Sequence, residues 1–261
     1  MKIDFNFWEN IKGFMHEEEA KRLYNIALKA SRKGAVLEIG SYCGKSALYI
    51  GSAAKENNQI LFSIDHHQGS EEQQPGEEYC DPDLINDSGK GINTLPYFLE
   101  TIKRAKLEDT VSPIISSSEE ASINWQQDLA MVFVDGGHSL EAAMADYFLW
   151  HKHLIPGGLL AIHDVFPNPE DGGRPPFEIY TLAKESGYYK EWPMIKSLAF
   201  LEKYLNNASP TGYEWEGQKI WMNYLKPYVD EFITDSYGTA VGVINPKSKY
   251  KVVIEGHADE D

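Results

Sequence analysis

Apolar positions in this chain follow two patterns that alternate along most of its length. Residues 17–33 carry apolar side chains at three- and four-residue spacing, which predicts an amphipathic helix. Glutamates begin this segment, and lysine and arginine end it before Gly34, in the order that the helix dipole favours. Residues 35–39 then form a mostly apolar run that is too short for a helix, and this run predicts a buried strand.

The same alternation continues as far as residue 202. Further helices are predicted at residues 45–54, 94–106, 118–125, 140–153 and 177–186. Further strands are predicted at residues 60–64, 111–115, 131–134, 159–162 and 197–202. Pro156, Gly157 and Gly158 are expected to form the turn that precedes residues 159–162. Short buried strands that alternate with helices predict an α/β protein with a doubly wound, mostly parallel sheet and helices on both faces.

Two stretches depart from this pattern. Residues 66–91 form an acidic segment with glycines and prolines, and a loop of this length in a compact domain is typically a functional lid or disordered. Residues 204–261 follow the last predicted strand of the alternating region. Their predicted elements are a helix near residues 220–233 and strands near residues 240–244 and 251–254. We therefore expect a main domain over residues 1–203 and a C-terminal α/β appendage, residues 204–261, that packs on it.

Composition limits the classes of partner. Lysine and arginine total 24 against 40 aspartates and glutamates, a net charge of −16, and this balance disfavours nucleic acid as a partner without excluding a local basic pocket. No apolar stretch approaches the roughly 20 residues that a membrane-spanning helix needs. The first residues carry no signal-type apolar run, and the two cysteines form no disulfide framework. We expect a cytoplasmic protein.

Glycine and polar residues gather where the first predicted strand meets its helix, in the segment VLEIGSYCGKS at residues 36–46. Glycines at such a point let the backbone approach a ligand, and the N-terminus of the helix offers free N–H groups to polar or anionic atoms. The spacing departs from the GxGxxG dinucleotide motif, and an ordinary tight turn explains two glycines equally well.

Polar residues also follow the next four predicted strands. Asp65 ends the second strand, where an acid can accept hydrogen bonds from both ribose hydroxyls of a nucleoside. Ser118 and Glu119 follow the third strand, where a helix cap explains the same letters. Asp135 ends the fourth strand, and His163 with Asp164 ends the fifth. Two carboxylates and an imidazole at neighbouring strand ends form a candidate divalent-metal site of Asp135, His163 and Asp164.

Together, the motifs EIGxxxGxS, IDxH, DGxH and HD resemble those of class I S-adenosylmethionine-dependent methyltransferases, in order and over about residues 17–202. The first motif resembles that of the catechol-type O-methyltransferases. The resemblance implies a Rossmann-like seven-stranded sheet with S-adenosylmethionine as the cofactor. The residues that it assigns to cofactor binding are Glu38, Gly40, Ser41, Tyr42, Gly44, Ser46, Asp65, His66, Ser118, Glu119 and Asp135.

The resemblance also implies Mg²⁺ or another divalent metal. In the catechol-type enzymes the strand ends supply an Asp and then an Asp-Asn pair, and here Asp135 matches the first while His163 and Asp164 occupy the pair. His163 departs from that pattern and suits Zn²⁺, Fe²⁺ or Mn²⁺ better than Mg²⁺. His138 falls where those enzymes carry a catalytic lysine, so it is the candidate base that removes the acceptor proton, although a histidine that fastens its loop is the alternative. Asp146, on the following helix, is expected to be exposed.

The predicted function is methyl transfer to a hydroxyl oxygen of a small-molecule acceptor, a sugar, polyol or natural product, with assistance from the metal. A homo-oligomer is expected from the resemblance. Three alternatives remain open: a metal-independent methyltransferase acting on nitrogen, oxygen or carboxylate; a non-catalytic adenosyl-binding protein; and hydroxylase chemistry on the same scaffold. Acceptor specificity is expected in residues 66–91, in residues 165–176 and in the appendage.

Overall fold

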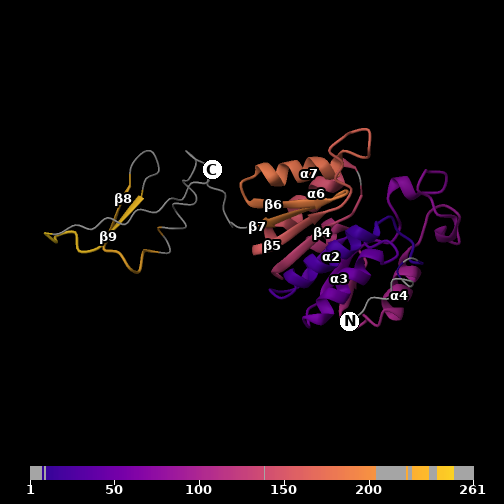
Figure 1. The fold of residues 1–261 in the computed structure, drawn as a ribbon, viewed down its shortest axis with the longest axis horizontal. Coiled ribbons are helices and arrows are strands. Elements are labelled where there is room, and N and C mark those ends of the chain that lie inside the picture. The colour runs from indigo at the N-terminus through magenta and orange to yellow at the C-terminus, as the bar shows by residue number, and fades with distance from the viewer. Residues whose placement is uncertain are drawn as a thin grey trace.

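A seven-stranded sheet forms the framework of the protein, in a computed structural model that describes residue 8 and residues 10–137, 139–203, 222, 225–234 and 240–249. Its strands are β1 (Val36–Ile39), β2 (Leu61–Ile64), β3 (Val111–Ile114), β4 (Leu129–Val134), β5 (Leu154–Ile162), β6 (Tyr189–Ile195) and β7 (Leu198–Lys203). They lie in the order β3-β2-β1-β4-β5-β7-β6 (Figure 1). β1 to β5 run parallel, whereas β7 is antiparallel to both of its neighbours. The predicted fold class is confirmed.

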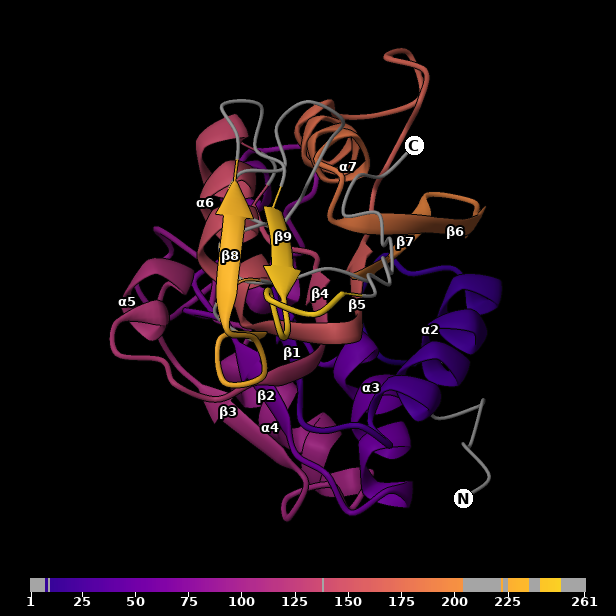
Figure 2. The same cartoon turned by 90° about the vertical axis from the view of Figure 1, so that its left-hand side faces the viewer.

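Helices cover both faces of the sheet (Figure 2). They are α2 (Glu17–Ala30), α3 (Lys45–Glu56), α4 (Leu95–Arg104), α5 (Ser118–Ser122), α6 (Leu140–Trp150) and α7 (Pro175–Glu185). α2, α3 and α4 pack together on one face, and α5, α6 and α7 pack together on the other. α2 begins at Glu17 because the side chain of His16 accepts a hydrogen bond from the backbone of Glu18, while Glu19 accepts one from the backbone of His16.

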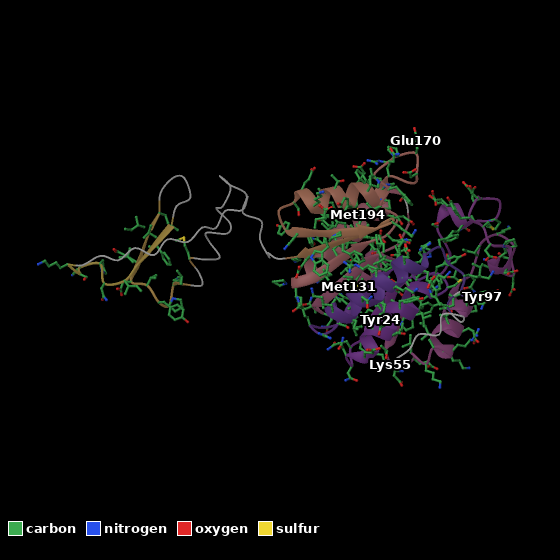
Figure 3. The ribbon with its side chains drawn as sticks, viewed as in Figure 1. Tyr24, Lys55, Tyr97, Met131, Glu170 and Met194 are labelled. Carbon is green, nitrogen blue, oxygen red and sulfur yellow. The ribbon has the colours of Figure 1, made fainter. Side chains whose placement is uncertain are left out.

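The core consists of two layers, one on each side of the sheet. Val36 of β1 packs toward the α2–α3 face, and the next residue, Leu37, packs toward the α6–α7 face. Both side chains are fully buried, which explains why the parallel strands read as continuous apolar runs. Met131 of β4 lies inside the main body, whereas Glu170 projects from the exposed loop that follows β5 (Figure 3).

Two strand predictions need correction. The segment Pro156 to Gly158 does not form a separate turn, because it lies inside β5. It accompanies a register shift in which Leu129 and Met131 of β4 pair with Leu154 and Leu159, so the extra residues bulge out of the ladder. β6 was not predicted. It lies at the edge of the sheet, where polar side chains and a proline are tolerated and the apolar pattern is lost.

The predicted helix near residues 220–233 is also wrong over its second half. Residues 231–234 form the strand β8 (Glu231–Thr234), which pairs with β9 (Ala240–Val243) in a separate two-stranded antiparallel sheet (Figure 1). The predicted strand at residues 251–254 lies outside the described residues. The packing of the appendage on the main domain stays a prediction. Among the described residues, no helix is long and apolar enough to cross a membrane.

Candidate active site

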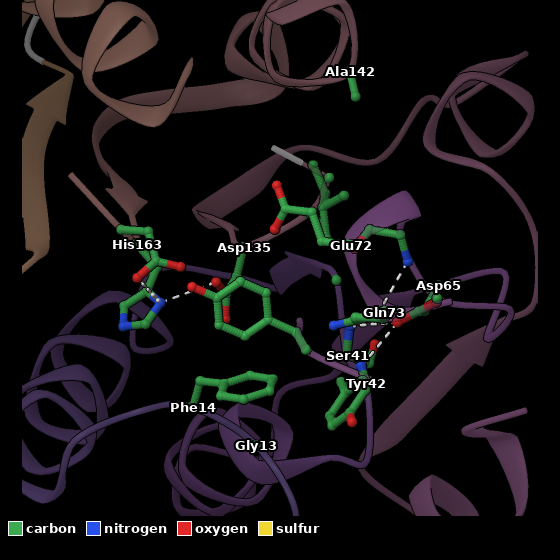
Figure 4. Close-up of a pocket in the computed structure, with 18 of the residues that line it drawn as sticks. Gly13, Phe14, Ser41, Tyr42, Asp65, Glu72, Gln73, Asp135, Ala142 and His163 are labelled. Carbon is green, nitrogen blue, oxygen red and sulfur yellow. Dashed lines mark hydrogen bonds and ion pairs between the residues drawn. The ribbon is translucent and has the colours of Figure 1, made fainter. Parts of the chain in front are cut away.

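A cavity of about 650 Å³ opens at the carboxyl ends of the parallel strands. Figure 4 shows Asp65, beyond β2, toward one end of it, and His163, beyond β5, toward the other. Phe14 and Tyr42 lie together along one wall, with ring centroids 5.9 Å apart. The carboxyl edge of a doubly wound sheet is where such folds bind their ligands.

Residues 66–91 cover this cavity as an ordered segment. It contains the short 3₁₀ helices η1 (Glu71–Gln73) and η2 (Pro82–Leu84) and is anchored by the buried side chain of Leu84. Lys12, from the segment before α2, forms ion pairs with Asp81 at 2.6 Å and Asp83 at 2.8 Å. The segment that precedes α2 is thereby tied to the predicted lid.

The loop after β1 depends on Gly40. This residue has φ of 87°, in the left-handed region, and a Cβ atom at this position would lie 2.0 Å from the carbonyl oxygen of Asp135. Only glycine fits so close to a neighbouring backbone. Gly40 therefore allows the ends of β1 and β4 to touch at the floor of the cavity.

Asp65 is held by backbone donors. One carboxylate oxygen, Oδ2, accepts the N–H of Ser41 at 2.9 Å and the N–H of Tyr42 at 2.8 Å, and Oδ1 accepts the N–H of His67 at 2.6 Å (Figure 4). A carboxylate has about four lone-pair sites, so one site on Oδ1 is left for a further donor. His66 lines the same part of the cavity.

Glu38 and Gly44, both predicted to bind cofactor, do not line the cavity, whereas Ser46 does. Glu38 is fully buried under the loop and accepts hydrogen bonds from Ser46 at 3.0 Å and Ser63 at 2.6 Å. Burial raises the pKa of the Glu38 carboxyl group to about 7, and the two serine hydroxyls only partly offset that rise. Gly44, with φ of 87°, caps the N-terminus of α3. These two residues support the loop from outside the cavity.

The three predicted metal ligands come together at the other end. Single ligand atoms of Asp135, His163 and Asp164 lie within 4.8 Å of one another. Nδ1 of His163 lies 3.0 Å from Oδ1 of Asp135 and 3.4 Å from Oδ1 of Asp164. Asp164 has φ of 56°, a conformation that aspartate tolerates better than most residues and that is common at functional sites. This set of two carboxylates and one imidazole fits a divalent cation of the Mn²⁺, Fe²⁺ or Zn²⁺ kind.

Glu19 of α2 completes this cluster and was not predicted. Its Oε2 lies 3.3 Å from Nε2 of His163, and its Oε1 accepts both the N–H and the hydroxyl of Ser197 at 2.9 Å. Burial alone would lower the pKa of His163, but Asp135, Asp164 and Glu19 together raise it well above the usual value. No sequence pattern distinguishes Glu19, because the helix dipole already explains an acid in the first turn of a helix.

Ser118 and Glu119, which were predicted to bind cofactor, line the cavity beyond β3. Their contact with the cofactor stays a prediction. Asp146 of α6 lines the same wall, and our expectation that it is exposed is wrong, since only 4% of it is accessible to solvent. Burial raises its pKa to about 7, and a hydrogen bond from Ser118 partly offsets this rise. Trp150, one turn further along α6, donates its indole N–H to the Ser118 hydroxyl at 2.8 Å.

His138, the predicted catalytic base, lies outside the described residues. Its neighbours are described: Gly137 lines the cavity, and Ser139 caps the N-terminus of α6 by accepting the N–H of Ala142. The role of His138 therefore stays a prediction from the sequence.

Fold and site together define a ligand-binding α/β protein of the class I methyltransferase architecture. Residues 37–165, which run from β1 to the end of β5 and contain most of the cavity's strand ends, match the model of a family described as a methyltransferase domain. This match and the fold support the class I methyltransferase that the motifs predicted.

Solved structures of low sequence identity share this fold. An O-methyltransferase from Bacillus cereus in complex with S-adenosylhomocysteine is 13% identical, with a TM-score of 0.52 over 78% of this chain and 93% of that chain. An S-adenosylhomocysteine-bound methyltransferase from Podospora anserina is 14% identical, with a TM-score of 0.54 over 77% and 87% of the two chains. The O-methyltransferase TomG from Streptomyces achromogenes, in complex with S-adenosylmethionine, is 14% identical, with a TM-score of 0.51 over 74% and 82%.

Proposed function

We propose that this protein transfers the methyl group of S-adenosylmethionine to a hydroxyl oxygen of a small molecule, with a divalent cation held by Asp135, His163 and Asp164. The observation that carries the proposal is that one cavity contains both the glycine loop with Asp65 and the cluster around His163. The names of the similar structures, which are O-methyltransferases with S-adenosyl compounds bound, support the same reaction.

The cofactor would lie over β1, β2 and β3. The free site on Oδ1 of Asp65 accepts a hydrogen bond from one ribose hydroxyl, and accepting from both hydroxyls would displace the N–H of His67. The glycine loop gives the methionine part close access to the backbone at Gly40 and Ser41. The sulfonium group then points along the cavity toward Asp135.

The acceptor would lie over β4 and β5. A cation there would be held by Asp135, His163 and Asp164 and would supply Lewis acidity that lowers the pKa of the acceptor hydroxyl. His163 can serve as a ligand through Nδ1, because its Nε2–H then donates to Glu19 and fixes the ring. A carboxylate behind a ligating histidine is the usual arrangement in metal sites.

The transfer itself is an in-line displacement. The acceptor oxygen forms a bond to the methyl carbon while the bond from that carbon to sulfur breaks, and the electron pair remains on sulfur. The hydroxyl proton passes to a base, for which His138 is the candidate from the sequence. Holding the oxygen and the methyl group in line supplies much of the rate in such reactions.

A second candidate is a metal-independent methyltransferase. The observation that favours it is that carboxylates contact both ring nitrogens of His163, Asp135 and Asp164 at Nδ1 and Glu19 at Nε2. In that case the cluster around His163 only orders the strand ends, and His138 alone would remove the proton from the acceptor. Treatment with EDTA separates the two candidates, because it abolishes turnover only if the cation takes part.

The test is calorimetric titration of S-adenosylhomocysteine into the full chain, with and without Mn²⁺. Binding that weakens in Asp65→Ala supports the cofactor site, and Mn²⁺ heats that disappear in Asp164→Ala support the metal site. A His138→Ala variant that binds both ligands but loses turnover supports the base. No binding under any condition would overturn the proposal. The homo-oligomer and the cytoplasmic location stay predictions.

A further inference from the structure

We propose that Lys12 is a clasp that holds part of the segment 66–91 closed over the cavity, so that S-adenosyl compounds enter and leave when its ion pairs to Asp81 and Asp83 part. The moving part is residues 68–83, which we call the flap. The clasp itself does not depend on what the cavity binds, whereas its effect on S-adenosyl compounds rests on the proposed function.

The flap has no buried side chain of its own. His67 and Leu84, the residues on either side of it, are buried, while every residue of the flap is exposed or partly exposed. Local hydrogen bonds hold its shape, since the side-chain amide of Gln74 donates to the carbonyl oxygens of Gln68 at 3.0 Å and Ser70 at 2.8 Å. A segment with few buried contacts opens at low cost in free energy, and these local bonds allow the flap to move as one unit.

The segment that reaches the flap is, by contrast, firmly packed. Ile11 and Met15 are buried in the core on either side of Lys12. Between them, the carbonyl oxygen of Gly13 accepts a hydrogen bond at 3.1 Å from the ammonium group of Lys45, the first residue of α3. The ammonium group of Lys12 is therefore presented to the flap from a fixed backbone.

The ion pairs join these two parts at the C-terminal end of the flap. Nζ of Lys12 lies 2.6 Å from Oδ2 of Asp81 and 2.8 Å from Oδ2 of Asp83. Hydrogen bonds to the two carboxylates raise the pKa of Lys12, and Lys12 in turn lowers the pKa of Asp81. The rings of Phe14 and Tyr79, from the same two segments, also meet, with centroids 5.8 Å apart. Partly exposed ion pairs are individually weak and sensitive to salt, which suits a closure that opens in every turnover.

All the charged groups of the clasp belong to the protein. Loss of Lys12 therefore changes how often the flap opens more than how tightly a ligand is held inside the cavity. Opening of the flap governs both entry and exit, so the association and dissociation rate constants should rise together while their ratio, the Kd, changes little.

The test measures both rate constants for S-adenosylhomocysteine by stopped flow on the full chain. In Lys12→Met both are expected to rise by about three- to tenfold, with Kd within about twofold of the wild-type value, because partly exposed ion pairs contribute modestly. Raising the salt concentration from about 0.05 M to about 0.5 M should raise the dissociation rate constant of the wild type and have little effect in Lys12→Met. Lys12→Arg keeps the charge and is expected to keep the wild-type rates.

Lys21→Met is the matched control. Lys21 forms an ion pair with Glu17 on the exposed surface of α2, so its loss is expected to leave both rate constants unchanged. The double variant Asp81→Asn, Asp83→Asn removes the partners of Lys12 and is expected to reproduce the rates of Lys12→Met.

Hydrogen–deuterium exchange gives a second measurement that needs no ligand. Peptides from the flap should exchange faster in Lys12→Met than in the wild type, while peptides from β1 should not change. Unchanged exchange and unchanged rate constants in Lys12→Met would overturn the clasp and leave the proposed function standing. A dissociation rate constant that rises alone would assign Lys12 to direct contact with the ligand and would also overturn the clasp. A wild type that binds no S-adenosylhomocysteine would overturn the proposed function, and exchange in the flap would still decide the clasp.

Discussion

The two ends of the cavity hold their central side chain in opposite ways. At the β1–β2 end, the negatively charged Asp65 is surrounded by the backbone N–H groups of Ser41, Tyr42 and His67. At the β4–β5 end, His163 is surrounded by carboxylates, and its principal partner on the far side is Glu19. One end is built from backbone and the other from side chains.

Because of this difference, the two ends of the cavity require different numbers of particular side chains. Backbone N–H groups are present whatever the side chain, so the Asp65 end requires only a glycine and one acid at consecutive strand ends. The His163 end requires four particular side chains, and Glu19 is 144 positions away from His163 in the chain. We therefore expect the His163 end to be the more sensitive to single substitutions.

The largest effect is expected from Asp164→Ala. Loss of this carboxylate removes a ligand from the proposed cation site, so turnover should fall by more than the ~100-fold that loss of an outer partner costs. Steady-state kinetics with added Mn²⁺ measures it, while calorimetry should show nearly unchanged S-adenosylhomocysteine affinity. Asp164→Asn, which tolerates the left-handed backbone, is the control for strain. Normal turnover in Asp164→Ala would remove the cation from the mechanism.

The next effect is expected from Asp65→Ala at the opposite end. It removes the acceptor for a ribose hydroxyl and also frees the N–H groups of Ser41 and Tyr42, so S-adenosylhomocysteine affinity should fall by about 10- to 100-fold. Mn²⁺ binding, measured in the same calorimeter, should be unchanged. Equal losses of both ligands would show that the two ends are not separable.

A smaller effect is expected from Glu19→Gln. The amide keeps the size of the side chain but holds the His163 ring less firmly, so Mn²⁺ affinity should fall by roughly tenfold, at the low end for an outer partner. Glu17→Gln, an exposed acid on the same helix, is the control. Mn²⁺ affinity in Glu19→Gln that equals the wild-type value would limit Glu19 to anchoring α2.

The smallest effect concerns pH and Glu38. Its pKa is raised from 4.5 to about 7 in the folded protein, so the folded state binds more protons than the unfolded state between these values and the free energy of unfolding falls as pH rises. Between pH 6 and 8 this amounts to about 1 kcal/mol. Denaturant titrations should show that Glu38→Gln removes this part of the pH dependence. An identical slope in the variant would contradict the raised pKa.

The sequence predicted the features that follow from local pattern. Buried parallel strands read as apolar runs, and Gly40, Asp65 and Asp135 stand at their ends, so both the sheet and the positions of these residues could be expected. Glu19 and Asp146 could not be predicted, because each lies on a helix in a place where an acid is ordinarily explained by the dipole or by solvent. Only tertiary packing brings Asp146 to the cavity and Glu19 to His163. The strand β6 could not be predicted for a similar reason, because an edge strand carries little of the apolar pattern from which strands are predicted.

The contact between Gly40 and the carbonyl of Asp135 has a consequence for cooperativity. There is no room for even a Cβ atom between the two backbones, so the glycine loop cannot shift without displacing the backbone of Asp135. A shift of Asp135 would displace the loop in the same way. The proposed cofactor and the proposed cation would therefore contact one shared wall. Binding of two ligands is thermodynamically reciprocal. If the cofactor changes the affinity for the cation by some factor, the cation changes the affinity for the cofactor by the same factor.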